Sequence, residues 1–204
     1  LAIHNARLYQ AEREARAAAE RATERLARIQ IVTTELAVAL TTERVAEIVI
    51  DHGVAAIGAS TGALWMLEPG GANLVMLRSL GFPDEAICRY SSIALNAAAP
   101  LTDAIRRRVA VFLESRADYA ERYAASESDT RDIPVEPPVQ SIACLPLLGG
   151  QDVLGGLAFA FADEKRFDEE EIRFLILLVD HCALALQRAA LYEAERRARA
   201  EKEL

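Results

Sequence analysis

The residues of this chain best suited to acid–base or metal chemistry are its three histidines, His4, His52 and His181. Two of them directly follow an aspartate, in the pairs Asp51–His52 and Asp180–His181. Both pairs fall in stretches with a helical pattern, where adjacent side chains point about 100° apart, so the carboxylate and the imidazole of a pair do not meet. We therefore expect helix-surface or packing histidines, with no catalytic role and no metal site.

Nucleophilic and phosphate-binding chemistry has equally little support. The three cysteines, Cys88, Cys144 and Cys182, lie far apart and form neither a CxxC pair nor the spacing of a zinc finger. This pattern predicts buried thiols in a reducing cytoplasm. The glycine-rich run GGQDVLGG at 149–156 lacks the Lys-Ser/Thr pair of a phosphate-binding loop. We interpret it as a hairpin turn.

Composition and charge limit the kinds of partner that this chain can bind. The chain has 204 residues and a net charge of −8, with the acidic excess between residues 41 and 183. Nucleic-acid binding needs a basic face, so we expect no nucleic-acid partner. The longest apolar run, FLILLV at 174–179, is shorter than the roughly 20 residues that span a bilayer, so we expect no membrane contact. The absence of an initiator Met indicates a piece of a longer protein.

The N-terminal 40 residues have the composition of a long helix. They contain no Gly or Pro and are rich in Ala, Arg and Glu. Apolar residues recur there at every seventh position: Leu1, Leu8, Ala15, Ala22, Ile29 and Leu36. A helix of this length would extend about 60 Å, more than a small domain covers, so the heptad predicts a second helix paired along it. The alternative is a surface helix of a single domain.

The same segment returns near the C-terminus. Residues 1–14 read LAIHNARLYQAERE and residues 184–197 read LALQRAALYEAERR, with eight identical positions at a constant offset. Leu184 and Leu191 therefore correspond to Leu1 and Leu8. We expect them to belong to a dimer-forming helix of the same kind.

All glycines and prolines lie between these two helical ends, where the pattern alternates between strands and helices. A helix is expected at 43–57, capped by Thr41 or Thr42. Strands are expected at 62–67, 73–81, 91–95, 111–113, 139–148 and 153–161. Further helices are expected from Pro100, near 119–125, and from Glu169 with Asp168 as N-cap. Helices around an antiparallel sheet of five or six strands make an α+β domain.

Three stretches together resemble a GAF domain: the hairpin SIACLPLLGGQDVLGGLAFAF, the helix RFDEEEIRFLILLVDHCALALQRAALYEAE, and the strand pair TGALWMLEPGGANLVMLRSLG. The resemblance covers roughly residues 30–195. It implies a central antiparallel sheet with helices packed on one face and a small-molecule pocket on the other. The residues expected to line that pocket are Trp65, Arg78, Ser91, Phe112, Tyr119, Tyr123 and Cys144. The alternative is that these aromatics simply fill the core.

The resemblance also explains the repeated ends. Residues 1–40 are interpreted as a connecting coiled-coil helix that starts at the end of a preceding GAF unit, 41–183 as a GAF domain, and 184–204 as the next connecting helix. The implied parent is a tandem-GAF bacterial signalling protein, a sensor histidine kinase. The implied function is non-catalytic: a homodimeric, cytoplasmic relay that also contacts neighbouring domains and requires no cofactor, with or without a small-molecule ligand.

Other readings stay open at this point. A structural dimerisation spacer that binds no ligand fits the same residues. Cyclic-nucleotide-binding relatives carry an N-K-F-D-E signature, and EKRFDEEE at 164–171 matches it loosely, without the Asn. The simpler explanation of that run is helix capping by Asp168. A methionine sulfoxide reductase would need exposed, paired thiols. Bilin attachment at Cys88 or Cys144 lacks a motif, and haem binding is disfavoured because His52 and His181 fall in the terminal helices and not over the pocket.

Overall fold

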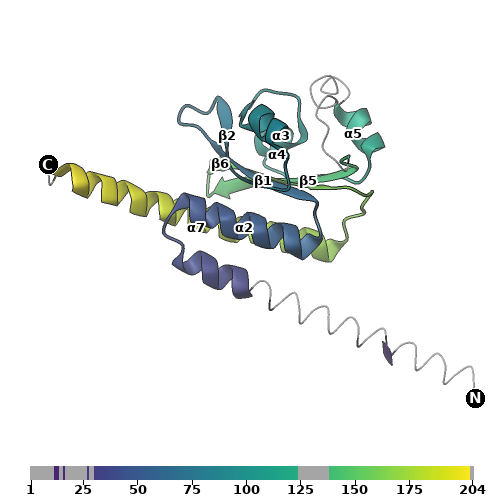
Figure 1. The fold of residues 1–204 in the computed structure, drawn as a ribbon, viewed down its shortest axis with the longest axis horizontal. Coiled ribbons are helices and arrows are strands. Elements are labelled where there is room, and N and C mark those ends of the chain that lie inside the picture. Colours follow the sequence, from purple (N-terminus) through teal and green to yellow (C-terminus); the bar gives the residue numbers. More distant parts are fainter. Residues whose placement is uncertain (1–11, 14–15, 17–26, 28–29, 124–137, 203–204) are drawn as a thin grey trace, which may run out of the picture.

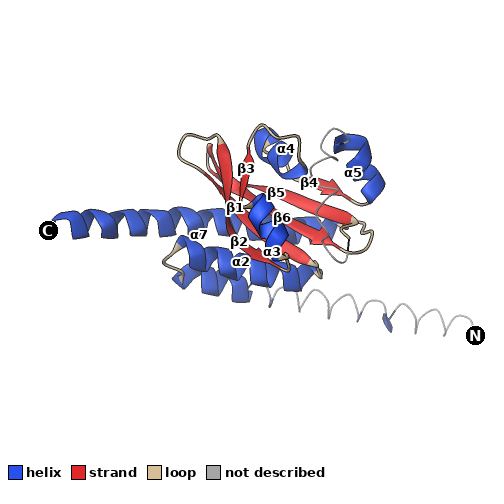
Figure 2. Ribbon diagram, turned by 45° about the horizontal axis from the view of Figure 1, so that its top comes forward, coloured by secondary structure: helices blue, strands red, loops and turns tan. Residues whose placement is uncertain are grey.

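The computed structural model describes residues 12–13, 16, 27, 30–123 and 138–202, and every structural statement below concerns these residues. They form a six-stranded sheet with helices on both faces (Figures 1 and 2). The strand order is β3-β2-β1-β6-β5-β4, and every neighbouring pair is antiparallel. The predicted α+β class and the GAF-like sheet are confirmed.

The strands lie close to their expected positions. Their bounds are β1 Thr61–Leu67, β2 Asn73–Leu80, β3 Ser92–Ala94, β4 Val111–Leu113, β5 Ser141–Gly149 and β6 Asp152–Phe161. β1, β6 and β5 occupy the middle of the sheet and are almost wholly apolar, because both of their faces are covered. Gly155 lies where β6 pairs with Met66 of β1, and an added Cβ there would come within 2.0 Å of the Trp65 carbonyl oxygen.

Two long helices cover one face of the sheet. α2 (Thr42–Ile57) packs on β1 and β2, and α7 (Glu169–Lys202) packs on β5 and alongside α2 (Figure 1). Thr41 caps α2 by accepting a hydrogen bond from the Arg44 backbone N–H at 3.2 Å, and Gly58 ends it in the left-handed region at φ 66°. The Asp168 carboxylate accepts from the N–H groups of Glu170 and Glu171, so the predicted N-cap of α7 is confirmed.

Three short helices cover the other face (Figure 2). They are α3 (Asp84–Tyr90), α4 (Pro100–Arg107) and α5 (Arg116–Tyr123). α4 begins at a proline, as expected, and packs on β5 and β6, while α5 contacts β4. α3 was not expected, since its seven residues show no clear apolar period.

Ahead of α2, residues 30–38 form a further helix, here called helix 30–38. It lies against α2 and α7 on the side away from the sheet (Figure 1). The helix ends at Val38, two residues before the expected boundary, and the chain turns back into α2. Within the described residues, helix 30–38 packs against the rest of the domain, while the predicted connecting helix over residues 1–40 lies mostly outside them.

α7 is long and apolar enough to cross a membrane by length and composition alone, since an 18-residue window in it reaches a mean hydropathy of 1.6. Half of that window is buried inside the protein. Its buried positions include Leu175, Cys182, Leu186 and Ala189, all in the core beneath the sheet. Packing against the sheet and α2 accounts for the buried half of this apolar window.

Candidate functional site

The face of the sheet under α3, α4 and α5 gathers four of the seven residues expected to line a pocket. Trp65, Tyr119, Tyr123 and Cys144 all belong to one apolar cluster there. Trp65 is 3% exposed and Cys144 2% exposed, and the Trp65 indole N–H donates to the Tyr90 carbonyl at 2.7 Å. These side chains contact their own chain, so this part of the face is filled by protein atoms.

The two tyrosines of this cluster make a polar contact with α4. The Tyr123 hydroxyl donates to a carboxylate oxygen of Asp103 at 3.0 Å, and the Tyr119 and Tyr123 rings lie 5.6 Å apart. Burial, followed by the Asp103 carboxylate, raises the pKa of Tyr123 to about 12. The phenol therefore stays protonated at neutral pH, as the donor that joins α5 to α4.

Arg78 and Phe112 were expected on this face, and that expectation is wrong. Arg78 lies opposite Leu64, on the face covered by α2 and α7. A β-bulge between Leu64 and Trp65 shifts the β1–β2 register, so that the side chains of β2 no longer alternate strictly between the two faces. Its guanidinium lies 3.4 Å from the Asp51 carboxylate of α2. The Phe112 side chain points to the opposite face of the sheet from its two neighbours in β4, and its ring centroid lies 5.0 Å from that of Phe167.

Ser91 and the cysteines complete the sequence-based candidates. Ser91 is exposed at the C-terminal end of α3, just before β3, and its hydroxyl donates to the Cys88 carbonyl. Cys88 is exposed, which corrects the expectation that all three thiols are buried. Burial raises the pKa of the Cys144 and Cys182 thiols well above the usual range, so neither is a thiolate nucleophile at neutral pH.

The run that loosely matches a cyclic-nucleotide signature makes structural contacts. Asp168 caps α7, and the Lys165 ammonium lies 2.8 Å from Glu171 and 5.2 Å from the centroid of the Phe161 ring. The Phe167 ring packs on Phe112 and Phe161. Helix capping and packing therefore account for these residues. Among the residues that the structure describes, no group of three or more His, Cys, Asp or Glu could hold a metal ion.

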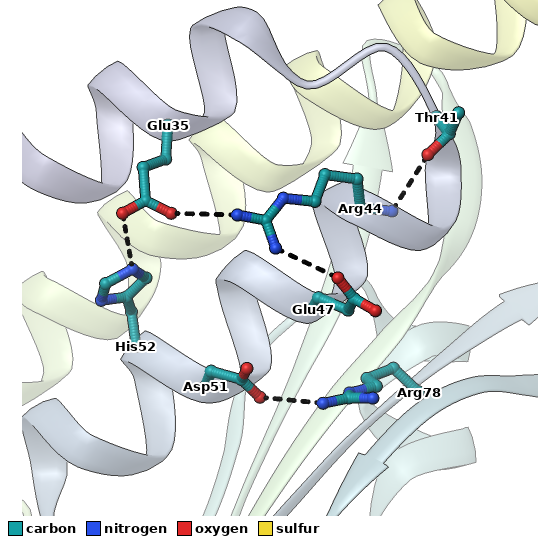
Figure 3. Close-up of polar contacts among 7 residues, drawn as sticks. All are labelled: Glu35, Thr41, Arg44, Glu47, Asp51, His52 and Arg78. Carbon is teal, nitrogen blue, oxygen red and sulfur yellow. Dashed lines mark hydrogen bonds and ion pairs between the residues drawn. The ribbon is translucent and has the colours of Figure 1, made fainter.

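The opposite face carries a polar junction between helix 30–38, α2 and β2 (Figure 3). Glu35 of helix 30–38 pairs with two residues of α2, Arg44 at 3.7 Å and His52 at 3.4 Å. Arg44 also contacts Glu47 at 3.1 Å. A separate pair, Asp51–Arg78, joins α2 to β2, so polar contacts link α2 both to helix 30–38 and to the sheet.

α7 joins this junction from its other side. The Arg188 guanidinium donates to the Leu36 carbonyl and, at 3.5 Å, to the Ala39 carbonyl. A Glu193 carboxylate oxygen accepts from the Thr42 backbone N–H at 2.9 Å and from the Thr42 hydroxyl at 3.3 Å. Sequence reasoning missed both residues, because neither stands out by spacing and their partners lie about 150 positions away along the chain.

The residues predicted to form a dimer helix fall into three groups. Leu1, Leu8, Ala15, Ala22 and Ile29 lie outside the described residues. Leu36 is 3% exposed and packs in the core of its own chain, so it is not available to a partner helix. Leu184 and Leu191 are 65% and 69% exposed. With Leu177 they form an apolar stripe along α7, in which a leucine recurs at every seventh position.

A small hollow lies between helix 30–38 and α7. Its lining consists of Val32, Thr33, Phe174, Leu177, Leu178 and His181. The hollow, of about 10 Å³, has room for at most about one water molecule. It marks a loose fit between the two helices, and a small-molecule ligand does not fit there.

Comparisons with known proteins agree with this architecture. A family model described as "GAF domain" matches residues 39–187. No protein of curated function matches the sequence. The GAF domain of an Acinetobacter phosphoenolpyruvate-protein phosphotransferase is similar, with TM-score 0.68, 16% identity, and coverage of 84% of this chain and 98% of that one.

Two further solved structures share the fold. One is a methyl-accepting chemotaxis protein, residues 122 to 287, with TM-score 0.65, 13% identity, and coverage of 80% of this chain and 99% of that one. The other is a domain of a putative two-component sensor histidine kinase protein from Sinorhizobium meliloti 1021, with TM-score 0.56, 15% identity, and coverage of 76% and 96%.

Proposed function

The chain belongs to the GAF domain family, a family of regulatory and sensory modules, and from this premise we propose that it is a non-catalytic relay. It passes a signal between the helices at its two ends within a larger signalling protein. The observation that carries the proposal is the junction at which helix 30–38, α2 and α7 share contacts. A displacement of helix 30–38 acts directly on α2 and α7, without passing through the sheet.

The outer part of α7 supports a homodimer as the working unit. Leu177, Leu184 and Leu191 form an apolar stripe with a spacing of seven residues. This is the spacing of a helix that pairs with another helix. Beyond the sheet, α7 continues as an isolated helix to Lys202 (Figure 1). A second copy of α7 along this stripe would bury both sets of leucines.

The repeated segment supports the larger context. Residues 1–14 match residues 184–197, as expected if GAF units follow one another in a cytoplasmic parent protein. A bacterial histidine kinase is the parent we favour, and one similar solved domain comes from such a protein. A pairing of equivalent helices would transmit a shift of packing from one unit to the next.

Sedimentation velocity tests the dimer. We expect the wild-type chain to be dimeric at low micromolar concentration, and Leu184→Glu with Leu191→Glu to be monomeric, because two carboxylates would be buried in the seam. Ala190→Glu is the control for position, since it adds one carboxylate at an exposed site about 100° from Leu191 around α7. A wild-type chain that stays monomeric over a wide concentration range would contradict the paired-helix relay.

Hydrogen exchange tests the relay itself. Val32 of helix 30–38 lines the contact with α7, so Val32→Ala loosens that contact while the sheet stays intact. A relay predicts faster exchange in α7 beyond residue 186. Exchange that changes only within residues 30–44 would contradict it.

A structural spacer is the second candidate. The observation that favours it is the filled face around Trp65 and Cys144. Both side chains are buried by their own chain, so a ligand has almost no exposed surface of theirs to contact. In a spacer, Val32→Ala would leave exchange in α7 unchanged while the dimer persisted. The same experiment therefore separates the two functions.

A further inference from the structure

The break between helix 30–38 and α2 contains no helix-breaking residue, and its local signal in the sequence is the Thr41 cap. Residues 36–43 read LAVALTTE and contain neither Gly nor Pro, the residues that usually end or kink a helix. The Ala and Leu positions of this segment favour helix. Thr41 adopts an extended conformation with φ −126° and ψ 151°, and its hydroxyl caps the α2 side of the break.

A break of this kind leaves carbonyl groups at one helix end and N–H groups at the next without helical partners. At this break α7 supplies partners for both. Arg188 donates to the Leu36 and Ala39 carbonyls at the end of helix 30–38, and Glu193 accepts from the Thr42 N–H at the start of α2. A cation at a helix C-terminus and a carboxylate at a helix N-terminus also match the helix dipoles.

The two contacts lie on different sides of α7. Arg188 and Glu193 are five residues apart, which places them about 140° apart around the helix. The two side chains reach different parts of the break: Arg188 contacts the Leu36 and Ala39 carbonyls, and Glu193 contacts the Thr42 N–H. A rotation of α7 about its axis moves the two side chains in different directions and so changes their contacts with the break.

We infer that Arg188 and Glu193 form a clamp by which α7 holds the break between helix 30–38 and α2. Loss of the clamp allows these two segments to straighten toward one continuous helix, and straightening displaces Arg188 and Glu193. The break is therefore a two-state element that links the direction of the incoming helix to the position of the outgoing one. The inference rests on the proposed relay and names the residues that couple its two ends.

Distance measurement between spin labels tests the clamp directly. Gln30→Cys and Ala55→Cys place labels at exposed sites on the two antiparallel segments, in a Cys88→Ser background, with labelled chains diluted in unlabelled protein. The folded-back arrangement holds the labelled helices side by side, whereas a continuous helix would separate these positions by roughly 38 Å. We expect one short distance in the wild-type chain.

We expect a second, long-distance population in Arg188→Gln with Glu193→Gln, and roughly tenfold faster amide exchange at residues 42–45. Glu195→Gln with Arg199→Gln is the matched control, because it removes the same charges from an ion pair on α7 that does not touch the break. The control should keep the wild-type distance. Arg188→Lys with native Glu193 should restore most of the short-distance population, because a cation remains near the carbonyls.

The clamp would be overturned if the double variant kept a single short distance and wild-type exchange at 42–45. Sedimentation of the same samples separates this failure from failure of the relay. A dimer whose break does not respond to Arg188 and Glu193 contradicts the clamp alone, whereas a monomeric wild-type chain contradicts the paired-helix relay.

Discussion

The two faces of the sheet are covered by helices of different length. On one face lie α2 and α7, with 16 and 34 residues, and helix 30–38 packs outside them. On the other face lie α3, α4 and α5, with seven or eight residues each. Both of the long connecting segments therefore lie on the same face.

The contacts differ as well. On the long-helix face a continuous apolar core runs from Leu36 through α7 to Phe159 of β6. On the short-helix face, aromatic side chains end in polar atoms that bond within the chain: Trp65 to the Tyr90 carbonyl, and Tyr123 to Asp103. A dense core moves as a unit, whereas a face held by short helices and single hydrogen bonds can rearrange locally. The comparison teaches that the first face is the one that would carry a displacement of the terminal helices in the proposed relay.

Phe159→Ala should have the largest effect. Phe159 is completely buried beneath α2, next to Gly53, and its removal leaves a cavity in the core that joins helices and sheet. We expect a loss of about 3–5 kcal/mol in the free energy of unfolding, measured by urea denaturation. A loss below about 1 kcal/mol would remove the distinction between the faces.

Leu36→Ala tests whether the packing of helix 30–38 contributes to the stability of the domain. Because Leu36 is buried in the core of its own chain, we expect a loss of about 2–3 kcal/mol in the same assay. Val38→Ala, at an exposed position on the same helix, serves as control and should cost little. Equal and small effects of both substitutions would mean that helix 30–38 is an independent connector in solution.

Tyr123→Phe probes the short-helix face and should cost about 1 kcal/mol, the usual value of one hydrogen bond. Its pH dependence is more specific. The pKa of Tyr123 rises from 10.0 to about 12 on folding, so the folded state favours the protonated phenol. That contribution is complete below pH 10 and is lost as the pH rises toward 12. The wild-type chain should therefore lose stability over this range more steeply than Tyr123→Phe.

The smallest effect is expected at the surface of α7. Arg173 pairs with Glu169 at 3.4 Å in a contact that is largely exposed, so Arg173→Ala should change the free energy of unfolding by less than about 0.5 kcal/mol. A change as large as that of Tyr123→Phe would show that the outer surface of α7 carries a contact absent from the single chain.

Periodicity and turn chemistry predicted most of the fold. The six strands, the Thr41 and Asp168 caps and the start of α4 at Pro100 follow from local patterns, because alternation, capping and proline geometry act within a few residues. The candidate pocket was predicted less well. Strict alternation in β2 would place Arg78 beside Met76, and only the β-bulge, which depends on pairing with β1, turns it toward Asp51.

The sequence by itself determined that this chain is an α+β domain with a helix at each end, since composition and period are local properties. Only the tertiary structure decided what those helices touch. Leu36 continues a heptad and yet packs inside its own chain, because the chain turns at residues 39–41. Arg188 and Glu193 carry no signal in the sequence, and they reach the break between helix 30–38 and α2 because folding packs α7 beside that turn.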